Sequence, residues 1–339
     1  MKSKATSLAR AAAAFLFVFG GSARAAQIDA APGAARIPLH YDAQLSGADL
    51  SGPAARLTFN GKTAWFLLDT GTGIHVLGDW FVKAAGLPLD ESTNKGLRSV
   101  DDAGNPVALR AVRNPVAGLE GGGTVSLGLA LVVDFPSEFE RFQIGGVISP
   151  QLLAADGRAA AFDLRTPELR LEPFDDAVRR LGAVALPRDR VRFCGSVDGP
   201  VPGLAFAIPV SAGGREGIVT VDSGAKLTRI APASVLIRGL RLRPGGETTG
   251  ATGARQFYSI APDVRLQFGG RATTLDARVS DADGQGCGRD GLLGLDALRE
   301  CAVVLGQRDV AIACGVPVAP KPPDAYIART GITPNKTRH

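Results

Sequence analysis

The sequence predicts an all-β protein built from two copies of one unit. Short runs rich in β-branched and aromatic residues alternate with turn residues, and the 339-residue chain contains 43 glycines and 22 prolines. Long stretches with helical periodicity are scarce. The apolar run at residues 66–68 ends in Asp69-Thr70-Gly71, and the run at 219–221 ends in Asp222-Ser223-Gly224. Two β-prone runs with the same abrupt ending indicate a duplication.

The two motifs lie in longer segments that match at a constant offset of 153 residues, from Leu57 to Leu89. Asn60-Gly61 corresponds to Gly213-Gly214, and both dipeptides suit a tight hairpin turn with positive φ. Other matched positions are Asp69 with Asp222, Thr70 with Ser223, Gly71 with Gly224, Leu77 with Ile230, and Gly86-Leu87 with Gly239-Leu240. Self-similarity of this kind indicates one structural unit used twice.

Composition and the repeat divide the chain into six segments. Charge, proline and glycine mark the connection between the copies, and the end of the chain lacks residues for a core. In chain order we assign a signal peptide (1–25), a flexible leader (26–35), an N-terminal lobe (36–173), an interlobe linker (174–204), a C-terminal lobe (205–315) and a disordered tail (316–339).

The N-terminus has the pattern of a secretory signal. Lys2, Lys4 and Arg10 precede an apolar stretch at residues 11–19, and Ala23-Arg24-Ala25 fits a cleavage site. The apolar stretch is too short to span a bilayer, and no other apolar run is long enough. We expect a secreted or periplasmic protein after cleavage near Ala25, with an uncleaved N-terminal anchor as the alternative.

The basic balance of the chain belongs mostly to this signal. The formal net charge of +5 falls to about +1 without residues 1–25, which carry four basic residues and no acid. Basic residues do not form a stripe interleaved with aromatics, so we do not expect nucleic acid as a partner. We expect a monomer.

Four cysteines suit an oxidising compartment, and four allow three pairings. The run 301–314 is typical of a hairpin with its turn at Gln307-Arg308, which places Cys301 opposite Cys314 at a non-hydrogen-bonded position. This register favours Cys301–Cys314 and leaves Cys194 with Cys287. A zinc site is disfavoured because no two cysteines are two to four residues apart, and we expect neither a metal nor a cofactor.

The two Asp-(Thr/Ser)-Gly motifs resemble those of the pepsin and retropepsin clan of aspartic peptidases. In that clan each lobe, or each subunit, donates one motif to a shared site. The resemblance covers most of residues 36–315. It implies a two-lobed pepsin/retropepsin-like fold with pseudo-twofold symmetry and a cleft between the lobes, with Asp69 and Asp222 as the catalytic residues.

The resemblance also assigns supporting roles to the residues that follow each aspartate. Glycine at Gly71 and Gly224 lets the two backbones approach each other, and the Thr70 and Ser223 hydroxyls are expected to tie the two turns together. The residue after each glycine differs between the two copies: it is Thr72 in the first copy and Ala225 in the second.

This difference suggests that the two aspartates are not equivalent. Thr72 could donate a hydrogen bond to the Asp69 carboxylate, whereas the Ala225 side chain offers Asp222 nothing. We therefore predict that Asp69 is the more readily ionised of the two.

Two nearby carboxylates that share one proton can activate water, since one accepts a proton from the water while the other polarises or protonates the substrate. We expect an aspartic endopeptidase that hydrolyses an extended peptide or unfolded protein. The alternative is a non-catalytic peptide-binding or inhibitory protein on the same fold.

Some positions depart from the pepsin pattern. Residues 90–124 occupy the place of a substrate-covering flap, or form an ordinary loop, and contain no tyrosine; the tyrosines are Tyr41, Tyr258 and Tyr326. Ser149 stands where the family has glycine, while Gly294 follows the pattern. A second flap-like loop is expected at residues 248–257.

Other catalytic chemistries lack their residues. The sequence has no His-Glu-x-x-His and no Gly-x-Ser-x-Gly motif. We interpret His75, shortly after the first motif, as a packed or surface residue, because no nucleophile accompanies it.

Overall fold

The computed structural model describes residues 35–41, 52–90, 98–100, 106–108, 110–154, 158–196, 203–249, 255–280 and 287–315. The expected signal peptide (1–25), nearly all of the expected leader and the expected tail (316–339) lie outside these ranges. Within the described ranges, no helix is long and apolar enough to cross a membrane.

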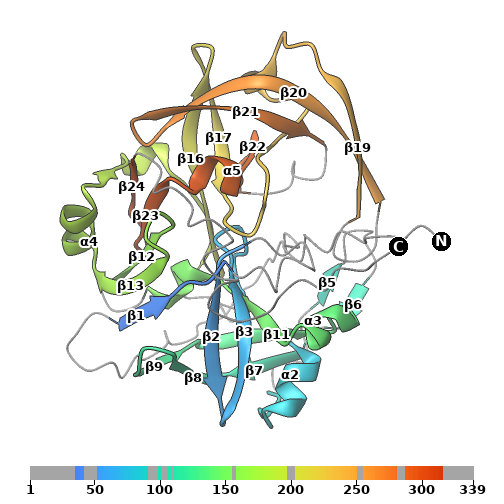
Figure 1. Cartoon of the computed structure of the whole chain (residues 1–339), viewed down its shortest axis with the longest axis vertical. Coiled ribbons are helices and arrows are strands. Elements are labelled where there is room, and N and C mark those ends of the chain that lie inside the picture. Colours follow the sequence, from blue (N-terminus) through green and yellow to red (C-terminus); the bar gives the residue numbers. More distant parts are fainter. Residues whose placement is uncertain are drawn as a thin grey trace, which may run out of the picture.

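An eight-stranded sheet organises the N-terminal lobe, at the bottom of Figure 1. Its strands are β2 (Ala54–Phe59), β3 (Lys62–Leu68), β4 (His75–Gly78), β7 (Arg110–Arg113), β8 (Val116–Leu119), β9 (Thr124–Ser126), β10 (Leu129–Val133) and β11 (Ile144–Ile148). Their order is β7-β10-β4-β11-β3-β2-β8-β9. The β2–β3 turn has positive φ at Asn60 and Gly61, as the Asn-Gly pair predicts.

A second eight-stranded sheet organises the C-terminal lobe, at the top of Figure 1. Its strands are β15 (Arg192–Ser196), β16 (Gly203–Ala212), β17 (Arg215–Val221), β18 (Arg229–Ile230), β19 (Arg243–Thr249), β20 (Arg255–Phe268), β21 (Arg271–Val279) and β22 (Gly291–Leu293). Their order is β15-β16-β17-β22-β18-β21-β20-β19.

The two sheets repeat one pairing pattern around the motif strands. In the N-terminal lobe, β3–β11 and β4–β10 are parallel pairs, and β11–β4 is antiparallel. In the C-terminal lobe, β17–β22 and β18–β21 are parallel, and β22–β18 is antiparallel. The duplication predicted from the 153-residue offset is therefore also a duplication of topology.

A six-stranded sheet is shared by both copies. Its strands are β1 (Ala35–Pro38), β12 (Arg158–Asp163), β13 (Glu168–Pro173), β14 (Val184–Ala185), β23 (Cys301–Leu305) and β24 (Val310–Cys314). Their order is β1-β13-β12-β23-β24-β14. Because β12 pairs with β23, the closing hairpins of the two copies are joined edge to edge. The fold is thus the all-β, two-lobed architecture that the sequence predicts.

Short helices and one small hairpin complete the described structure. They are α2 (Asp79–Ala84), α3 (Ser137–Arg141), α4 (Phe174–Leu181), α5 (Leu295–Leu298), the 3-10 turns η2 (Pro150–Leu153), η3 (Arg188–Arg190) and η4 (Val235–Ile237), and the paired strands β5 (Arg98–Val100) and β6 (Pro106–Ala108). Residues 174–204, expected to link the lobes, contain α4, β14 and β15. The β5–β6 pair lies in the region expected to form a flap.

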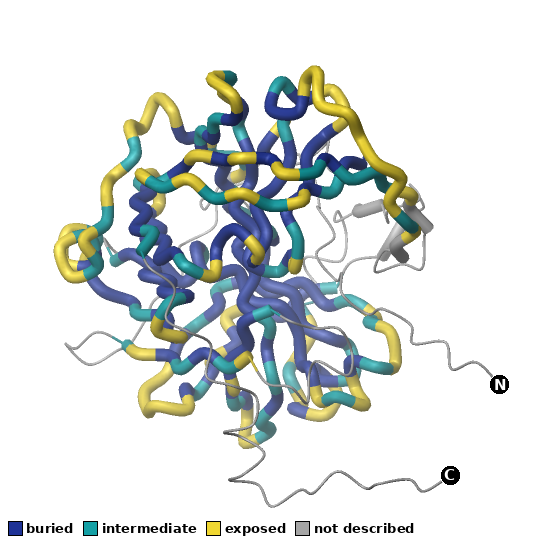
Figure 2. The backbone as a smooth tube through the Cα atoms, turned by 45° about the horizontal axis from the view of Figure 1, so that its top comes forward, coloured by how far each residue is buried: buried dark blue, intermediate teal, exposed yellow. Residues whose placement is uncertain are grey.

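A continuous apolar core runs through both lobes, as the buried backbone in the middle of Figure 2 illustrates. In the N-terminal lobe its centre is a trio of fully buried rings, Phe59, Phe66 and Phe81, with centroids 5.1–5.6 Å apart. Val219, Val221 and other residues of the second copy belong to the same cluster. The motif strands are therefore anchored in one core.

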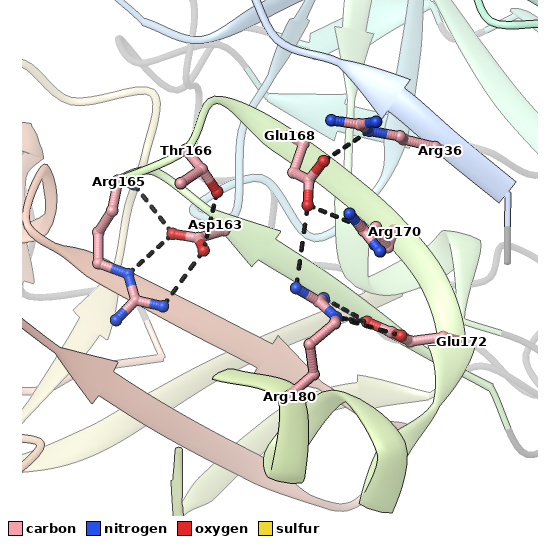
Figure 3. Close-up of polar contacts among 8 residues, drawn as sticks. All are labelled: Arg36, Asp163, Arg165, Thr166, Glu168, Arg170, Glu172 and Arg180. Carbon is pink, nitrogen blue, oxygen red and sulfur yellow. Dashed lines mark hydrogen bonds and ion pairs between the residues drawn. The ribbon is translucent and has the colours of Figure 1, made fainter. Parts of the chain in front are cut away.

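The rim of the shared sheet is held by acids paired with arginines (Figure 3). Glu168, nearly buried on β13, accepts hydrogen bonds of 2.6 Å from both Arg36 on β1 and Arg170. Arg180 from α4 bonds Glu172 on the same strand. Both buried glutamates therefore have arginine partners, as buried charges require.

Both cysteine pairs favoured by the sequence are bonded in the structure. Cys301 and Cys314 are register partners in β23–β24, with a Cα–Cα distance of 4.0 Å. Cys194 on β15 bonds Cys287, with a Cα–Cα distance of 5.7 Å and a sequence separation of 93 residues. The second bond ties the first strand of the C-terminal lobe to the segment that leads into β22.

We predict that replacing Cys194 and Cys287 together by alanine lowers the free energy of unfolding by about 2–4 kcal/mol, because the bond restricts a long loop in the unfolded chain. Chemical denaturation followed by circular dichroism measures the loss. Under reducing conditions the variant and the parent protein should have the same midpoint. An unchanged midpoint of the variant under oxidising conditions would contradict the prediction.

Candidate active site

Asp69 and Asp222, here called the dyad, occupy equivalent places at the ends of β3 and β17. The Asp69 backbone N–H donates to the carbonyl oxygen of Ile148 on β11 (2.9 Å). The Asp222 N–H donates to that of Leu293 on β22 (3.0 Å). Both aspartates are almost completely buried, with 2% and 3% exposure, and their side chains hydrogen-bond each other. The structure therefore brings together the two acids that the sequence singled out.

Each aspartate is held by the turn that follows it. The Asp69 Oδ1 atom accepts the backbone N–H groups of Gly71 (2.7 Å) and Thr72 (3.2 Å). The Asp222 Oδ1 atom accepts those of Gly224 and Ala225, both at 2.9 Å. Two N–H donors fix one oxygen of each carboxyl group and leave the other for the partner acid or a ligand.

Four hydrogen bonds, here called the Thr70–Ser223 clasp, connect the two turns. The Thr70 hydroxyl accepts the Ser223 backbone N–H (3.0 Å) and donates to the carbonyl of Val221 (2.8 Å). Reciprocally, the Ser223 hydroxyl accepts the Thr70 N–H (3.0 Å) and donates to the carbonyl of Leu68 (2.8 Å). All four hydrogen bonds join one copy to the other. The clasp therefore fixes the distance between Asp69 and Asp222.

The glycines are required by the other carboxyl group. A Cβ atom on Gly71 would lie within 2.8 Å of all three carboxyl atoms of Asp222. A Cβ atom on Gly224 would lie equally close to the carboxyl of Asp69. Real Cβ atoms do not approach so closely, so the side chain of either aspartate fills the space that glycine leaves in the opposite turn.

Burial raises the pKa of both aspartates. The pKa of Asp222 is raised well above its ordinary value by burial and by the neighbouring Asp69 charge, with Arg229 acting in the opposite direction. The pKa of Asp69 is raised by burial, while hydrogen bonds from Asp222 and from the N–H groups of Gly71 and Thr72 oppose the rise. The proton of the pair therefore favours Asp222.

The predicted basis for this asymmetry is wrong. Thr72 bonds Asp69 through its backbone N–H, and the N–H of Ala225 makes the same bond to Asp222. Residue type at this position consequently does not distinguish the two acids. Burial is the largest cause of the raised pKa in both acids, and the charge of Asp69 raises the pKa of Asp222 further.

The two lobes use different side chains to bind the backbone N–H of the residue that follows β11 or β22. In the C-terminal lobe the Thr228 hydroxyl accepts the N–H of Gly294 (3.1 Å). At the equivalent place in the N-terminal lobe, the His75 Nδ1 atom accepts the N–H of Ser149 (3.2 Å). His75 is buried, and burial lowers its pKa from 6.5 to about 3. It is therefore a neutral packed residue, as the sequence interpretation had it.

Gln151 is a supporting residue that the sequence reasoning missed. It is fully buried, and its side-chain amide nitrogen lies 3.2, 2.8 and 2.7 Å from the carbonyl oxygens of Thr70, Thr72 and Leu204. The Leu204 N–H donates to the Gly73 carbonyl (2.7 Å). Gln151 thereby ties the turn after Asp69 to β16 of the other lobe.

The sequence carried one signal for this role. Gln151 corresponds to Asp296 in the second copy, and Asp296 accepts hydrogen bonds from the backbone and hydroxyl of Thr228. A polar residue at the same place in both copies, within an otherwise apolar run, marks a buried polar contact.

Each lobe also contributes a hairpin on the right-hand side of Figure 1, β5–β6 from the first copy and β19–β20 from the second. The flap-like loop expected at residues 248–257 falls only in part on this second hairpin, because residues 250–254 lie outside the described ranges. Tyr258 lies on its strand β20, so a tyrosine belongs to the C-terminal hairpin.

Among the described residues, no three His, Cys, Asp or Glu side chains gather as a metal site requires.

Comparison with known proteins gives a family match for part of the first copy. Residues 55–133, which include β3 and Asp69, match the family model described as aspartyl protease. Among solved structures, an aspartic proteinase from Irpex lacteus is similar over 85% of this chain and 99% of its own, with 13% identity and a TM-score of 0.44. No curated protein matches the chain.

The family match covers the first Asp-Thr-Gly motif, and the second copy repeats its topology around Asp222. The similarity to the aspartyl protease model is thus confined to part of the first copy, residues 55–133.

Proposed function

We propose that the protein is an aspartic endopeptidase in which Asp69 and Asp222 activate water. The observation that carries the proposal is the buried, mutually hydrogen-bonded carboxyl pair, held by one clasp at the seam of two equivalent motifs. Two carboxyl groups at this separation cannot both ionise cheaply, so they share one proton. A pair that holds one proton can act as base and acid in the same step.

The raised pKa of Asp222 supports a proposed division of roles within the pair. Ionised Asp69 takes a proton from a water bound between the carboxyls, and the resulting hydroxide attacks the peptide carbonyl carbon. Protonated Asp222 donates to the carbonyl oxygen, which forms a neutral tetrahedral diol. Collapse of the diol breaks the C–N bond, a proton passes to the leaving nitrogen, and the pair returns to its singly protonated state.

The substrate proposed is a peptide or unfolded protein in extended conformation. An extended chain can bind between the lobes by strand-like hydrogen bonds, with its side chains alternating between the two lobes. Both halves of the dyad come from one chain, so a monomer suffices. The two disulfides fit the proposed secreted or periplasmic location.

A non-catalytic peptide-binding protein is the second candidate. The observation that favours it is the absence of tyrosine from residues 90–124, where the pepsin branch places its flap tyrosine. Peptide binding without cleavage at any pH would select this candidate.

We predict that Asp69→Asn and Asp222→Asn each reduce kcat by on the order of 10⁴-fold or more, because either change removes half of the acid–base pair. Digestion of a peptide library, with products identified by mass spectrometry, measures the loss. Asp176→Asn on the exposed face of α4 is a matched control and should retain activity. Substantial cleavage by both dyad variants would refute the mechanism.

The raised pKa of Asp222 also has a consequence for stability. The folded protein holds this proton more tightly than the unfolded chain does, so the associated stability is complete below the ordinary pKa of 3.8. It is lost as the pH rises through the raised value. We predict that Asp222→Asn, which stays neutral, becomes progressively more stable than the parent protein as the pH rises from about 4 towards neutrality.

Urea denaturation of both proteins across this pH range measures the difference. Asp176→Asn again serves as control and should show a constant difference from the parent. A stability difference between Asp222→Asn and the parent that does not change with pH would contradict a raised pKa.

The buried His75 lowers the stability of the folded protein at low pH. Its folded-state pKa of about 3 lies below the ordinary 6.5, so its stabilising contribution is present above pH 6.5 and is lost as the pH falls towards 3. We predict that His75→Thr, which copies the residue at the equivalent position Thr228, loses less stability on acidification than the parent protein. The quantity to compare is the slope of unfolding free energy against pH in this window; equal slopes would contradict the prediction.

A further inference from the structure

A groove lies between the C-terminal lobe and the end of the shared six-stranded sheet. Its volume is about 580 Å³. One side is formed by Leu186, which follows β14, and the others by residues 209–211 of β16 and residues 267–272 around the β20–β21 turn. Asp69 and Asp222 are not among its lining residues, so the groove is separate from the candidate active site.

The groove is apolar inside and extends along β24. Leu186 packs against the main core, and Phe268, which also lines the groove, belongs to that core. The Leu186 N–H donates to the carbonyl of Val310, the first residue of β24 (2.8 Å). Arg271, another lining residue, lies at the opposite end of β24, where it donates to the carbonyl of Gly315. The groove therefore spans the five residues of β24, about 17 Å of strand.

One wall of the groove is an open sheet edge. The strand β16 pairs with β15 as far as Ala207 and with β20 from Ser211 onward. Within the described residues, the segment 208–210 between them has no strand partner on this edge. Pro209 lies in this gap, as expected of a residue that has no N–H for a sheet ladder. The carbonyl oxygens of such an edge can accept hydrogen bonds from an extended chain.

The C-terminal segment of the chain begins at this groove. The Cys301–Cys314 disulfide fixes the end of β24. The next residue, Gly315, donates its N–H to the carbonyl of Glu300 (2.9 Å) and accepts from Arg271, which also forms an ion pair with Glu300. The chain therefore leaves the described structure beside a lining residue of the groove. A segment tethered at this point has a high effective concentration at the groove.

The sequence that follows has a proline at every third position. Residues 316–323 read Val-Pro-Val-Ala-Pro-Lys-Pro-Pro, with prolines at 317, 320 and 323. A polyproline II helix has three residues per turn, so these prolines share one edge of it. Such a helix makes no internal hydrogen bonds and binds apolar grooves through its proline rings. At about 3.1 Å per residue, residues 316–321 cover about 19 Å, which matches the length of the groove.

We propose that residues 316–323 turn back at Gly315 and bind in this groove of the same chain as a polyproline II segment. The periodic prolines pack on the apolar lining, and the N–H groups of the residues between them face the open edge of β16. The inference does not depend on the proposed peptidase activity.

Photo-crosslinking in the full chain tests this placement. The photoreactive residue p-benzoylphenylalanine replaces Ala319, and Asp69→Asn prevents self-cleavage. Mass spectrometry should locate the crosslinks in residues 209–211 and 267–272. In an equal mixture of unlabelled and nitrogen-15-labelled chains, each crosslink should join peptides with the same label. Crosslinks between differently labelled peptides would place the segment on a second copy, and crosslinks elsewhere on the fold would place it outside the groove; either result would overturn the inference.

The proline repeat offers a matched pair of variants for the same experiment. Replacing Pro317, Pro320 and Pro323 together by alanine should reduce the crosslink yield in the groove by on the order of tenfold, because three buried rings are lost. Pro322→Ala, which is outside the repeat, should leave the yield unchanged. Equal yields from the triple variant and Pro322→Ala would contradict the proposed packing.

Limited proteolysis in the same Asp69→Asn background measures the docked fraction. Elastase, which accepts small residues, can cut Val318–Ala319 inside the segment and Ala325–Tyr326 beyond it. Ala272→Arg places a bulky side chain in the groove and should raise the ratio of the first cleavage rate to the second about tenfold, because cleavage follows the population of the open form.

Thr274→Arg is the matched control for Ala272→Arg. Thr274 is the next exposed residue on the same face of β21 and does not line the groove, so its replacement should leave the cleavage ratio unchanged. The same ratio with and without Ala272→Arg would overturn the inference.

Discussion

The rest of the site depends on the reciprocal hydrogen bonds between Thr70 and Ser223. Each hydroxyl accepts from the backbone of the opposite turn and donates to the strand that precedes it. Buried hydroxyl groups must find such partners, so any separation of the lobes at this seam would leave four polar groups unsatisfied. The clasp therefore holds the two carboxyl groups close together, although this proximity opposes the ionisation of both.

Contacts around the clasp stabilise the seam and offset the free-energy cost of burying two acids. Burial opposes ionisation of both acids, and four backbone N–H groups partly compensate for the lost water. The continuous core anchors both motif strands, the shared six-stranded sheet joins the copies, and Gln151 adds a cross-lobe contact at the first turn. A strained, partly protonated pair can persist because the surroundings determine its position.

Much of this could be predicted from the sequence, because the decisive signals are local and occur twice. The Asn60-Gly61 turn, the two motifs and the Cys301–Cys314 register all depend on residues close together in the chain. The match of Gln151 with Asp296 indicates a buried polar contact, but the partner Leu204 could not be predicted, because it lies 53 residues away and in the other lobe.

The central claim is that Asp69 and Asp222 share one proton. A direct measurement is the titration of both carboxyl groups by carbon-13 NMR, with single Asp→Asn variants used for assignment. The account predicts two well-separated steps that belong to the pair, with the carboxyl of Asp69 ionised in the first and that of Asp222 protonated to higher pH. Two independent titrations, each near the ordinary aspartate value of 3.8, would contradict it.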